Sequence, residues 1–232
     1  MATLSSVKFV FGIFSPFAHY NTESAKIKEK NENLRKKLKY SQKCFIMKKE
    51  NNEGRKNRMI RLIHTSDLHL DSEFSCNDPK LTSLRKKEQR ALFANLMMYV
   101  RDQKADVLLI SGDLFDKKQP EKETAEVVLR EFRNTPDTEI FIAAGRSDCW
   151  RPGSFLYETE FPPKVHVFRE EALSFFSVDR LHLTVYGYSF CHRNLTKNPF
   201  AVMPPVDKSR FNLLCGAGSL SLVPDCCPIT AE

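Results

Sequence analysis

Residues 106–116 read DVLLISGDLFD, and the apolar run VLLI within them is unbroken. Such a run is typical of a β-strand that is buried on both faces of a sheet. Residues 60–64 (IRLIH) and 139–144 (EIFIAA) predict two more strands. The spacing of apolar residues between these runs predicts one helix over 83–104 and another after Pro120. This alternation of strands and helices predicts an α/β fold with parallel strands.

The two predicted helices should each bury one apolar face. For the first helix, the expected face consists of Leu84, Leu92, Leu96, Tyr99 and Val100. For the second helix, it consists of Ala125, Val128, Leu129 and Phe132.

Beyond residue 162 the chain becomes rich in segments that resemble strands. These segments are 165–168, 173–178, 181–188 and 211–215. They predict a second sheet packed against the first. We therefore expect an α/β fold of mixed α+β character, in which two packed mixed β-sheets are flanked by helices.

Polar residues directly follow two of the buried strands, where open α/β sheets hold their ligands. Asp67 and His69 follow the first strand, and Asp113 follows the second, behind Gly112. Taken singly, Asp67 reads as a turn or helix cap, His69 as a surface loop residue and Asp113 as a turn former. Their joint placement at consecutive strand ends favours a divalent-cation site, because residues two apart in extended chain point to the same side. A carboxylate placed like Asp113 can also bridge two metal ions that activate water against a phosphoester.

Residues 60–74 (IRLIHTSDLHLDSEF), together with 106–116, resemble the calcineurin-like metallophosphoesterases, and within them the DNA-repair exonuclease branch. The resemblance extends over residues 59–232. It implies two mixed sheets packed between helices and a site for two divalent metals, commonly manganese, iron or zinc. It also implies cleavage of phosphoester bonds, which in this branch are those of nucleic acids.

The resemblance assigns roles to several residues. Asp67 and His69 match ligands of the first metal, and Asp113 matches the carboxylate that bridges two metals. Three further aspartates are expected to hold the ligand loops in place through hydrogen bonds. These are Asp71, Asp116 and Asp148.

The chain departs from the family in the third motif, which in the family reads Gly-Asn-His-Asp. Here residues 145–148 read GRSD, so Arg146 replaces a metal ligand and Ser147 replaces the general acid. Arginine cannot bind a metal because its guanidinium has only donors, and a serine hydroxyl is far too weak an acid near neutral pH. We expect the positive charge of Arg146 to lie near Asp113 and partly replace the missing cation.

The last two motifs are also altered. The fourth normally ends in His-Gly, and here Cys215 precedes Gly216, so a thiolate becomes a further candidate ligand. The final motif, Gly-His-x-His, does not occur before the chain ends at Glu232. We therefore expect one metal site rather than two, in a domain over residues 59–232 that is incomplete at its C-terminus.

The net charge of +7 is concentrated outside that domain. Residues 24–58 carry thirteen Lys or Arg against four Asp or Glu, whereas residues 59–232 carry 22 against 24. We expect residues 1–58 to form a basic, disordered leader. Because Met59 directly precedes the first strand, translation starting there is a further hypothesis. The charge of the domain itself gives no support for nucleic-acid binding.

The seven cysteines form no C-x-x-C pair, and their odd number does not close a set of disulfides. Reduced thiols in the cytoplasm are therefore expected. The apolar stretch 7–14 is too short to span a bilayer, so no membrane partner is expected.

The sequence leaves three functions open. The first is a metal-dependent phosphoesterase or DNA exonuclease-like hydrolase whose activity is impaired by the substituted motifs. The second is a catalytically inactive module that binds nucleic acid, another phosphodiester or a protein. The third is a fragment of a longer nuclease, whose unpaired sheet edges would offer a surface to a protein partner.

Overall fold

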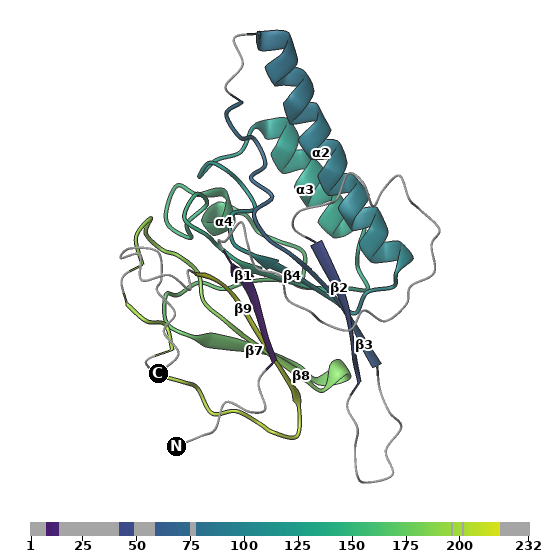
Figure 1. Ribbon diagram of the computed structural model, residues 1–232, viewed down its shortest axis with the longest axis vertical. Helices are drawn as coiled ribbons and strands as arrows, with labels where there is room; N and C mark the ends of the chain where they lie inside the picture. The colour runs from purple at the N-terminus through teal and green to yellow at the C-terminus, as the bar shows by residue number, and fades with distance from the viewer. Residues whose placement is uncertain are drawn as a thin grey trace.

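The computed structural model describes residues 8–13, 42–48, 59–74, 78–195, 197–200 and 202–218. Their strands form one sheet of five strands and one of four. The two sheets pack on each other, and two long helices cover the outer face of the five-stranded sheet (Figure 1). The prediction of two packed mixed sheets flanked by helices is confirmed.

The five-stranded sheet carries the strands that were predicted first. Its order is β2 (Gln42–Lys48), β3 (Met59–Thr65), β4 (Val107–Ser111), β5 (Glu139–Ala143) and β6 (Val165–Val167). The strands from β3 to β6 are parallel, as predicted for β3, β4 and β5, and β2 is antiparallel to β3. The segment of β6 was expected in the second sheet, and this was wrong, because its backbone pairs with β5. Every residue of β4 and β5 is buried, which explains their unbroken apolar runs.

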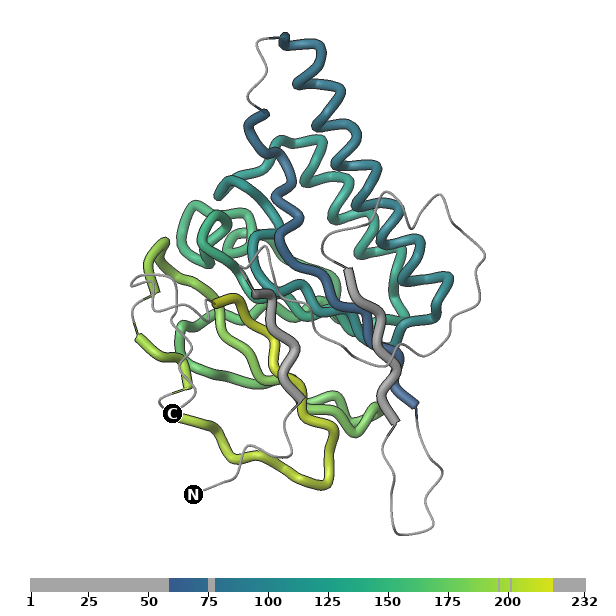
Figure 2. The backbone as a smooth tube through the Cα atoms, in the orientation of Figure 1, coloured from purple at the N-terminus to yellow at the C-terminus, as the bar shows by residue number. Residues whose placement is uncertain are grey.

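The four-stranded sheet is mixed. Its order is β1 (Lys8–Ile13), β9 (Phe211–Gly218), β8 (Leu183–Gly187) and β7 (Ser174–Val178). Strand β9 is parallel to both of its neighbours, and β7 is antiparallel to β8. In Figure 2 the yellow β9 runs beside the green β8. Leu109 and Phe141 of one sheet meet Val185 and Leu213 of the other in the apolar layer between them.

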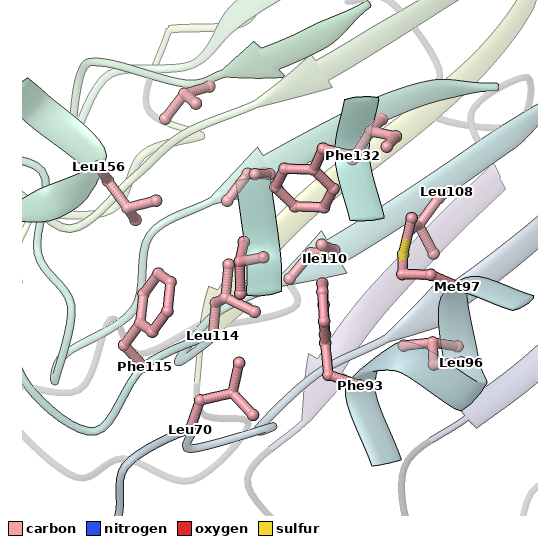
Figure 3. Packing of buried hydrophobic residues seen from close by; sticks show 14 of the residues in the cluster. Leu70, Phe93, Leu96, Met97, Leu108, Ile110, Leu114, Phe115, Phe132 and Leu156 are labelled. Carbon is pink, nitrogen blue, oxygen red and sulfur yellow. The ribbon is translucent and has the colours of Figure 1, made fainter. Parts of the chain in front are cut away.

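A second apolar core lies between the five-stranded sheet and the helices α2 (Pro79–Asp102) and α3 (Lys122–Arg133). Figure 3 shows Phe93 of α2 and Phe132 of α3 near Ile110 of β4, and the two rings pack edge to face with centroids 5.9 Å apart. Two shorter helical elements follow, α4 (Phe155–Glu158) and the 3₁₀ turn η2 (Asp179–Leu181). Among the described residues no helix has the length and apolar character needed to cross a bilayer.

The face that α2 buries differs in part from the prediction. Leu84 and Leu92 are 52% and 38% exposed, whereas Phe93 and Met97 are buried. Leu84 lies in the first turns of α2, which extend away from the sheets, so it has no core to reach (Figure 1). Leu92 lies farther along the helix, where its neighbour Phe93 takes the buried position. The helix also begins at Pro79, earlier than expected, because the Asp78 side chain accepts a hydrogen bond from the backbone N–H of Lys80. The face predicted for α3 is confirmed.

Two strands lie within residues 1–58, where we expected a disordered leader. Strand β1 covers one edge of β9, and β2 covers the outer edge of β3. Both edges would otherwise present unpaired backbone groups, and pairing them stabilises a strand even in a segment of unfavourable composition. The rest of residues 1–58 lies outside the described residues, so the proposed division into leader and domain stays a prediction.

Candidate metal centre

The loops that follow β3 and β4 are bonded to each other through their backbones. The N–H of Asp67 donates to the carbonyl of Gly112 at 3.1 Å, and that of His69 donates to the carbonyl of Asp113 at 2.9 Å. Leu70 and Leu114 continue this pairing at 3.0 Å, and both side chains are buried in the core beneath α2 (Figure 3). Because apolar side chains anchor both loops, the polar residues between them are held in fixed positions.

The predicted ligands meet at this edge of the sheet. Asp67, His69 and Asp113 each offer one ligand atom, and the three atoms lie within 4.8 Å of one another. All three residues have left-handed backbones, with φ of 54°, 44° and 50°. This conformation is uncommon for residues other than glycine, and it clusters at functional sites because the strain persists only where the surrounding structure enforces it.

Burial and the nearby Asp113 carboxylate both disfavour the negative charge of the Asp67 carboxyl. Burial raises the pKa of the Asp67 carboxyl, a hydrogen bond from Ser66 lowers it, and the nearby Asp113 carboxylate raises it. A bound cation would relieve this repulsion.

His69 is oriented by a neighbouring carboxylate. Its Nδ1 lies 2.7 Å from Oδ1 of Asp116, and its Nε2 lies 3.9 Å from Oδ2 of Asp113. Since a carboxylate only accepts hydrogen bonds, this contact places the proton of a neutral imidazole on Nδ1. The lone pair of Nε2 then points toward the other two ligands, as in many metal sites where a carboxylate orients a histidine.

Asp71 links the first ligand loop to the helices. Its buried carboxylate accepts hydrogen bonds from the Thr124 hydroxyl and from the backbone N–H of Glu121, both at 2.7 Å. From α2, the Gln89 amide donates to the His69 carbonyl at 3.0 Å and accepts from the Asp71 N–H at 3.1 Å. The sequence did not reveal Gln89 or Thr124, because a polar residue within a helix carries no local sign of a distant partner.

The loop after β5 contacts the carboxylate oxygen of Asp113 that does not face His69. The Ser147 N–H donates to Oδ1 of Asp113 at 2.8 Å. A side chain at Gly145 would place its Cβ 2.4 Å from the same oxygen, so the close approach of this loop requires glycine. Buried Asp148 accepts from the N–H groups of Gly145 at 2.7 Å and Phe115 at 3.2 Å, which ties the two loops together. Burial, and then the negative charge of Asp113, raise the pKa of the Asp148 carboxyl to about 7.

The structure does not bring Cys215 into the group of three ligands. Its side chain is fully buried between the sheets, with Sγ 3.4 Å from the Ser111 hydroxyl and 3.7 Å from the Ile110 carbonyl. Burial raises the pKa of this thiol to about 12, so the metal-binding thiolate is scarce near neutral pH. Arg146 is half-buried, and its Nε donates to the carbonyl of Arg193 at 3.1 Å.

Among the described residues, the donor set of Asp67, His69 and Asp113 fits one divalent cation. Two carboxylates and an imidazole are suitable ligands for manganese, iron or zinc. On the other side of Asp113, the Ser147 amide already engages Oδ1, and the adjacent Arg146 offers no acceptor. Within the described part of the chain, these three residues form the metal-competent cluster.

Residues 60–224 match the family of calcineurin-like phosphoesterases. The chain is 26% identical over 155 residues to the uncharacterized metallophosphoesterase YhaO of Bacillus subtilis, an alignment that covers 61% of this chain and 36% of the relative. It is also 26% identical over 171 residues to the DNA double-strand break repair protein Mre11 of Methanopyrus kandleri, covering 66% of this chain and 34% of the relative. The chain thus spans about a third of the length of these relatives.

Proposed function

Because the chain belongs to the calcineurin-like phosphoesterase family, we propose that it is a metal-dependent phosphodiester hydrolase with impaired activity. The family binds divalent metals, and the observation that carries the proposal is the convergence of Asp67, His69 and Asp113 on one point. We propose that these residues hold a single ion, with manganese, iron and zinc as the candidates.

A divalent ion held there would supply Lewis-acid polarisation of a phosphoryl oxygen. The protein contributes the orientation of the ligands. Asp116 keeps the proton of His69 on Nδ1 and leaves Nε2 as a donor to the ion. Asp148 holds the loop of Asp113 against the loop after β5. Ser147 cannot protonate a leaving group efficiently, because an effective general acid needs a pKa near the working pH. We therefore expect slow turnover.

Nucleic acid is the proposed substrate class, and the repair protein Mre11 among the relatives supports it. Residues 59–232 carry slightly more acidic than basic side chains, so long-range attraction to polyanions would contribute little. We also propose that the protein resides in the cytoplasm, in keeping with the free thiols of Cys149, Cys191 and Cys215.

A second candidate is a module that binds a phosphodiester without hydrolysing it. The bond from the Ser147 amide to Asp113 favours this function, because it directs a proton donor of the protein at the carboxylate oxygen that lies away from His69. The two candidates share the metal site and differ only in turnover.

Two measurements on the full chain test the proposal. Calorimetric titration with Mn²⁺ should show one ion per chain, and bis-p-nitrophenyl phosphate should be hydrolysed slowly. Asp113→Asn should abolish both, whereas Asp179→Asn, a change at an 89% exposed side chain in η2, should leave both unchanged. Binding without turnover selects the second candidate. Absence of Mn²⁺ binding would overturn both.

A further inference from the structure

The loop that carries two of the candidate metal ligands ends at a buried carboxylate. Asp67, His69 and Asp71 alternate along this loop, and all three have left-handed backbones, with φ of 54°, 44° and 63°. Strain of this kind persists only where surrounding contacts hold it. The side chain of Asp71 is 1% exposed, and its carboxylate accepts hydrogen bonds from α3 and from the residue before it. The position of His69 therefore depends on what stabilises the Asp71 carboxylate.

A cation of α2 lies beside that carboxylate. Nη1 of Arg90 is 4.0 Å from Oδ1 of Asp71, and the Arg90 side chain is itself only 14% exposed. The separation is too long for a hydrogen bond, but the attraction between opposite charges remains strong at this distance where water is largely excluded. A buried negative charge is costly unless an opposite charge compensates it. Arg90 therefore stabilises the ionised carboxylate of Asp71 in its buried position.

The hydroxyl of Thr124 links these two charges. Nη1 of Arg90 donates to Oγ1 of Thr124 at 3.4 Å, and this hydroxyl donates to Oδ1 of Asp71 at 2.7 Å. A hydroxyl has a single proton, so a hydroxyl that accepts from the guanidinium can direct that proton at the carboxylate. Thr124 is 0% exposed, so water does not compete for either bond. Arg90 thus acts on Asp71 both through its charge and through this hydroxyl.

Carboxylates at the start of α3 hold the guanidinium in place. Nη2 of Arg90 lies 2.8 Å from Oε2 of Glu123, and Nη1 lies 3.8 Å from Oε2 of Glu121. Lys86, about one turn earlier in α2, also forms an ion pair with Glu121. A planar guanidinium can contact several acceptors at once, which the compact ammonium group of lysine does less well. The Arg90 side chain is therefore fixed where the two helices meet the first ligand loop.

We propose that Arg90 is a positioning residue of the metal centre, which acts through Asp71 on the loop of His69. The inference rests on the proposed function, since its effect is on the cation that the site holds. Within the described chain, the polar partners of Arg90 are not candidate ligands, so its effect on the ion is indirect.

The proposal predicts an effect opposite in sign to that of simple charge repulsion. Removing a positive charge near a cation site should strengthen Mn²⁺ binding slightly, because repulsion is lost. Removing the cation that stabilises Asp71 should instead weaken Mn²⁺ binding, because the loop of His69 is held less firmly. A residue that only joined α2 to α3 would lower the free energy of unfolding and leave the Mn²⁺ affinity of the folded chain unchanged.

Calorimetric titration of the metal-free full chain with Mn²⁺ tests the proposal. Arg90→Met, which keeps an apolar stem, should lower the Mn²⁺ affinity by about fivefold, less than the loss of a direct partner of a ligand. Arg85→Met is the matched control, since it removes the same charge from the same helix. Arg85 is 54% exposed and pairs with Glu88 at the surface, so its loss should change the affinity by less than about twofold.

A double-mutant cycle tests the route through Asp71. In the Asp71→Asn background, Arg90→Met should change the Mn²⁺ affinity by less than about twofold, because the charge that Arg90 compensates is absent. Thr124→Val provides a second background if Asp71→Asn does not fold, since it removes the hydroxyl and keeps the shape of the side chain. There too, the effect of Arg90→Met should be smaller than in the wild type.

Three results would overturn the inference. In the first, Arg90→Met leaves the Mn²⁺ affinity unchanged or raises it. In the second, Arg85→Met weakens Mn²⁺ binding as much as Arg90→Met does. In the third, Arg90→Met has its full effect in the Asp71→Asn and Thr124→Val backgrounds. If the wild-type chain bound no Mn²⁺, the proposed function and the inference would both fall, whereas normal Mn²⁺ binding with any of these three results would remove the inference alone.

Discussion

The two oxygens of the Asp113 carboxylate face regions of different construction. Oδ2 faces His69, in a region where three ligands converge and where Asp116 orients the imidazole. Oδ1 faces the loop after β5, where the backbone N–H of Ser147 donates to it. The first region offers electron pairs to a cation, whereas the second offers a proton donor. The same carboxylate therefore presents one oxygen to the candidate metal site and the other to a backbone donor of the protein.

The two regions are also held by different parts of the fold. Hydrogen bonds from α2 and from the start of α3 support the first ligand loop, through Gln89 and Thr124. The second region depends on buried Asp148, which bonds to both the Asp113 loop and the loop after β5. Substitutions that remove the contacts of α2 and α3 with the first ligand loop should therefore differ from substitutions of Asp148 in how much they change metal affinity relative to the free energy of unfolding.

The largest effect is expected from Asp148. Its pKa in the folded chain is about 7, above the usual 3.8, so the folded state holds a proton that the unfolded state loses first. Stability from this group is therefore fully present below pH 4 and is lost as the pH rises through 7, by up to about 4 kcal/mol. Urea unfolding of the metal-free chain should give a lower free energy of unfolding at pH 8 than at pH 5.

Asp148→Asn provides the control for that pH dependence, since it cannot titrate. The difference in stability between this variant and the wild type should change with pH in the same window. An identical pH profile for the two proteins would assign the effect to another group. It would also contradict the description of Asp148 as a buried carboxyl that bridges the two loops.

Asp116→Asn should come next, and it acts on the first region. Losing the carboxylate that holds the proton on Nδ1 of His69 should weaken Mn²⁺ binding by about 10- to 100-fold, or about 1.4 to 2.7 kcal/mol. Calorimetric titration measures this affinity, with Glu73→Gln, at an 83% exposed side chain of the loop after β3, as the control. Equal affinities for all three proteins would show that Asp116 does not orient the ligand.

A smaller effect is expected from Gln89→Ala, which removes the hydrogen bonds of the Gln89 amide to His69, Asp71 and Ser72 in the first ligand loop. The free energy of unfolding should fall by about 1 to 2 kcal/mol, and Mn²⁺ affinity should fall several-fold. Gln103→Ala, beyond the last turn of the same helix, is the comparison. A loss of stability with unchanged Mn²⁺ affinity would mean that α2 does not position His69.

The smallest effect is expected from Cys215→Ala. Because its thiol lies between the sheets and outside the ligand group, Mn²⁺ affinity should change by less than about twofold, with a modest loss of stability from the small cavity. A substantial loss of Mn²⁺ or Zn²⁺ affinity would place the thiol in the metal site. It would contradict the difference described between the two sides of Asp113.

Much of the fold could be predicted because its signals are local. The runs that became β4 and β5 are apolar throughout, and strands buried on both faces need that composition. The candidate ligands Asp67, His69 and Asp113 could be proposed from the sequence because they follow the ends of such strands. The strand β2 was missed because it lies in a basic stretch that was interpreted as a leader, although its residues 44–47 are apolar. Pairing with β3 stabilises it there.

The supporting contacts could not be predicted, since they join distant parts of the chain. Gln89 reaches His69 across 20 positions, and Thr124 reaches Asp71 across 53. The direction of the Cys215 side chain depends on the register of β9 against β8, because successive residues of a strand face opposite sides. Helical periodicity placed Leu84 on a buried face, but it could not reveal that the first turns of α2 extend beyond the core.

The central claim is that Asp67, His69 and Asp113 hold one cation and that the other side of Asp113 holds none. Electron paramagnetic resonance of the full chain with excess Mn²⁺, after removal of free ion, tests it most directly. We expect one Mn²⁺ per chain with the hyperfine sextet of an isolated ion, and loss of that signal in Asp113→Asn. Two spin-coupled ions per chain, or none, would contradict it.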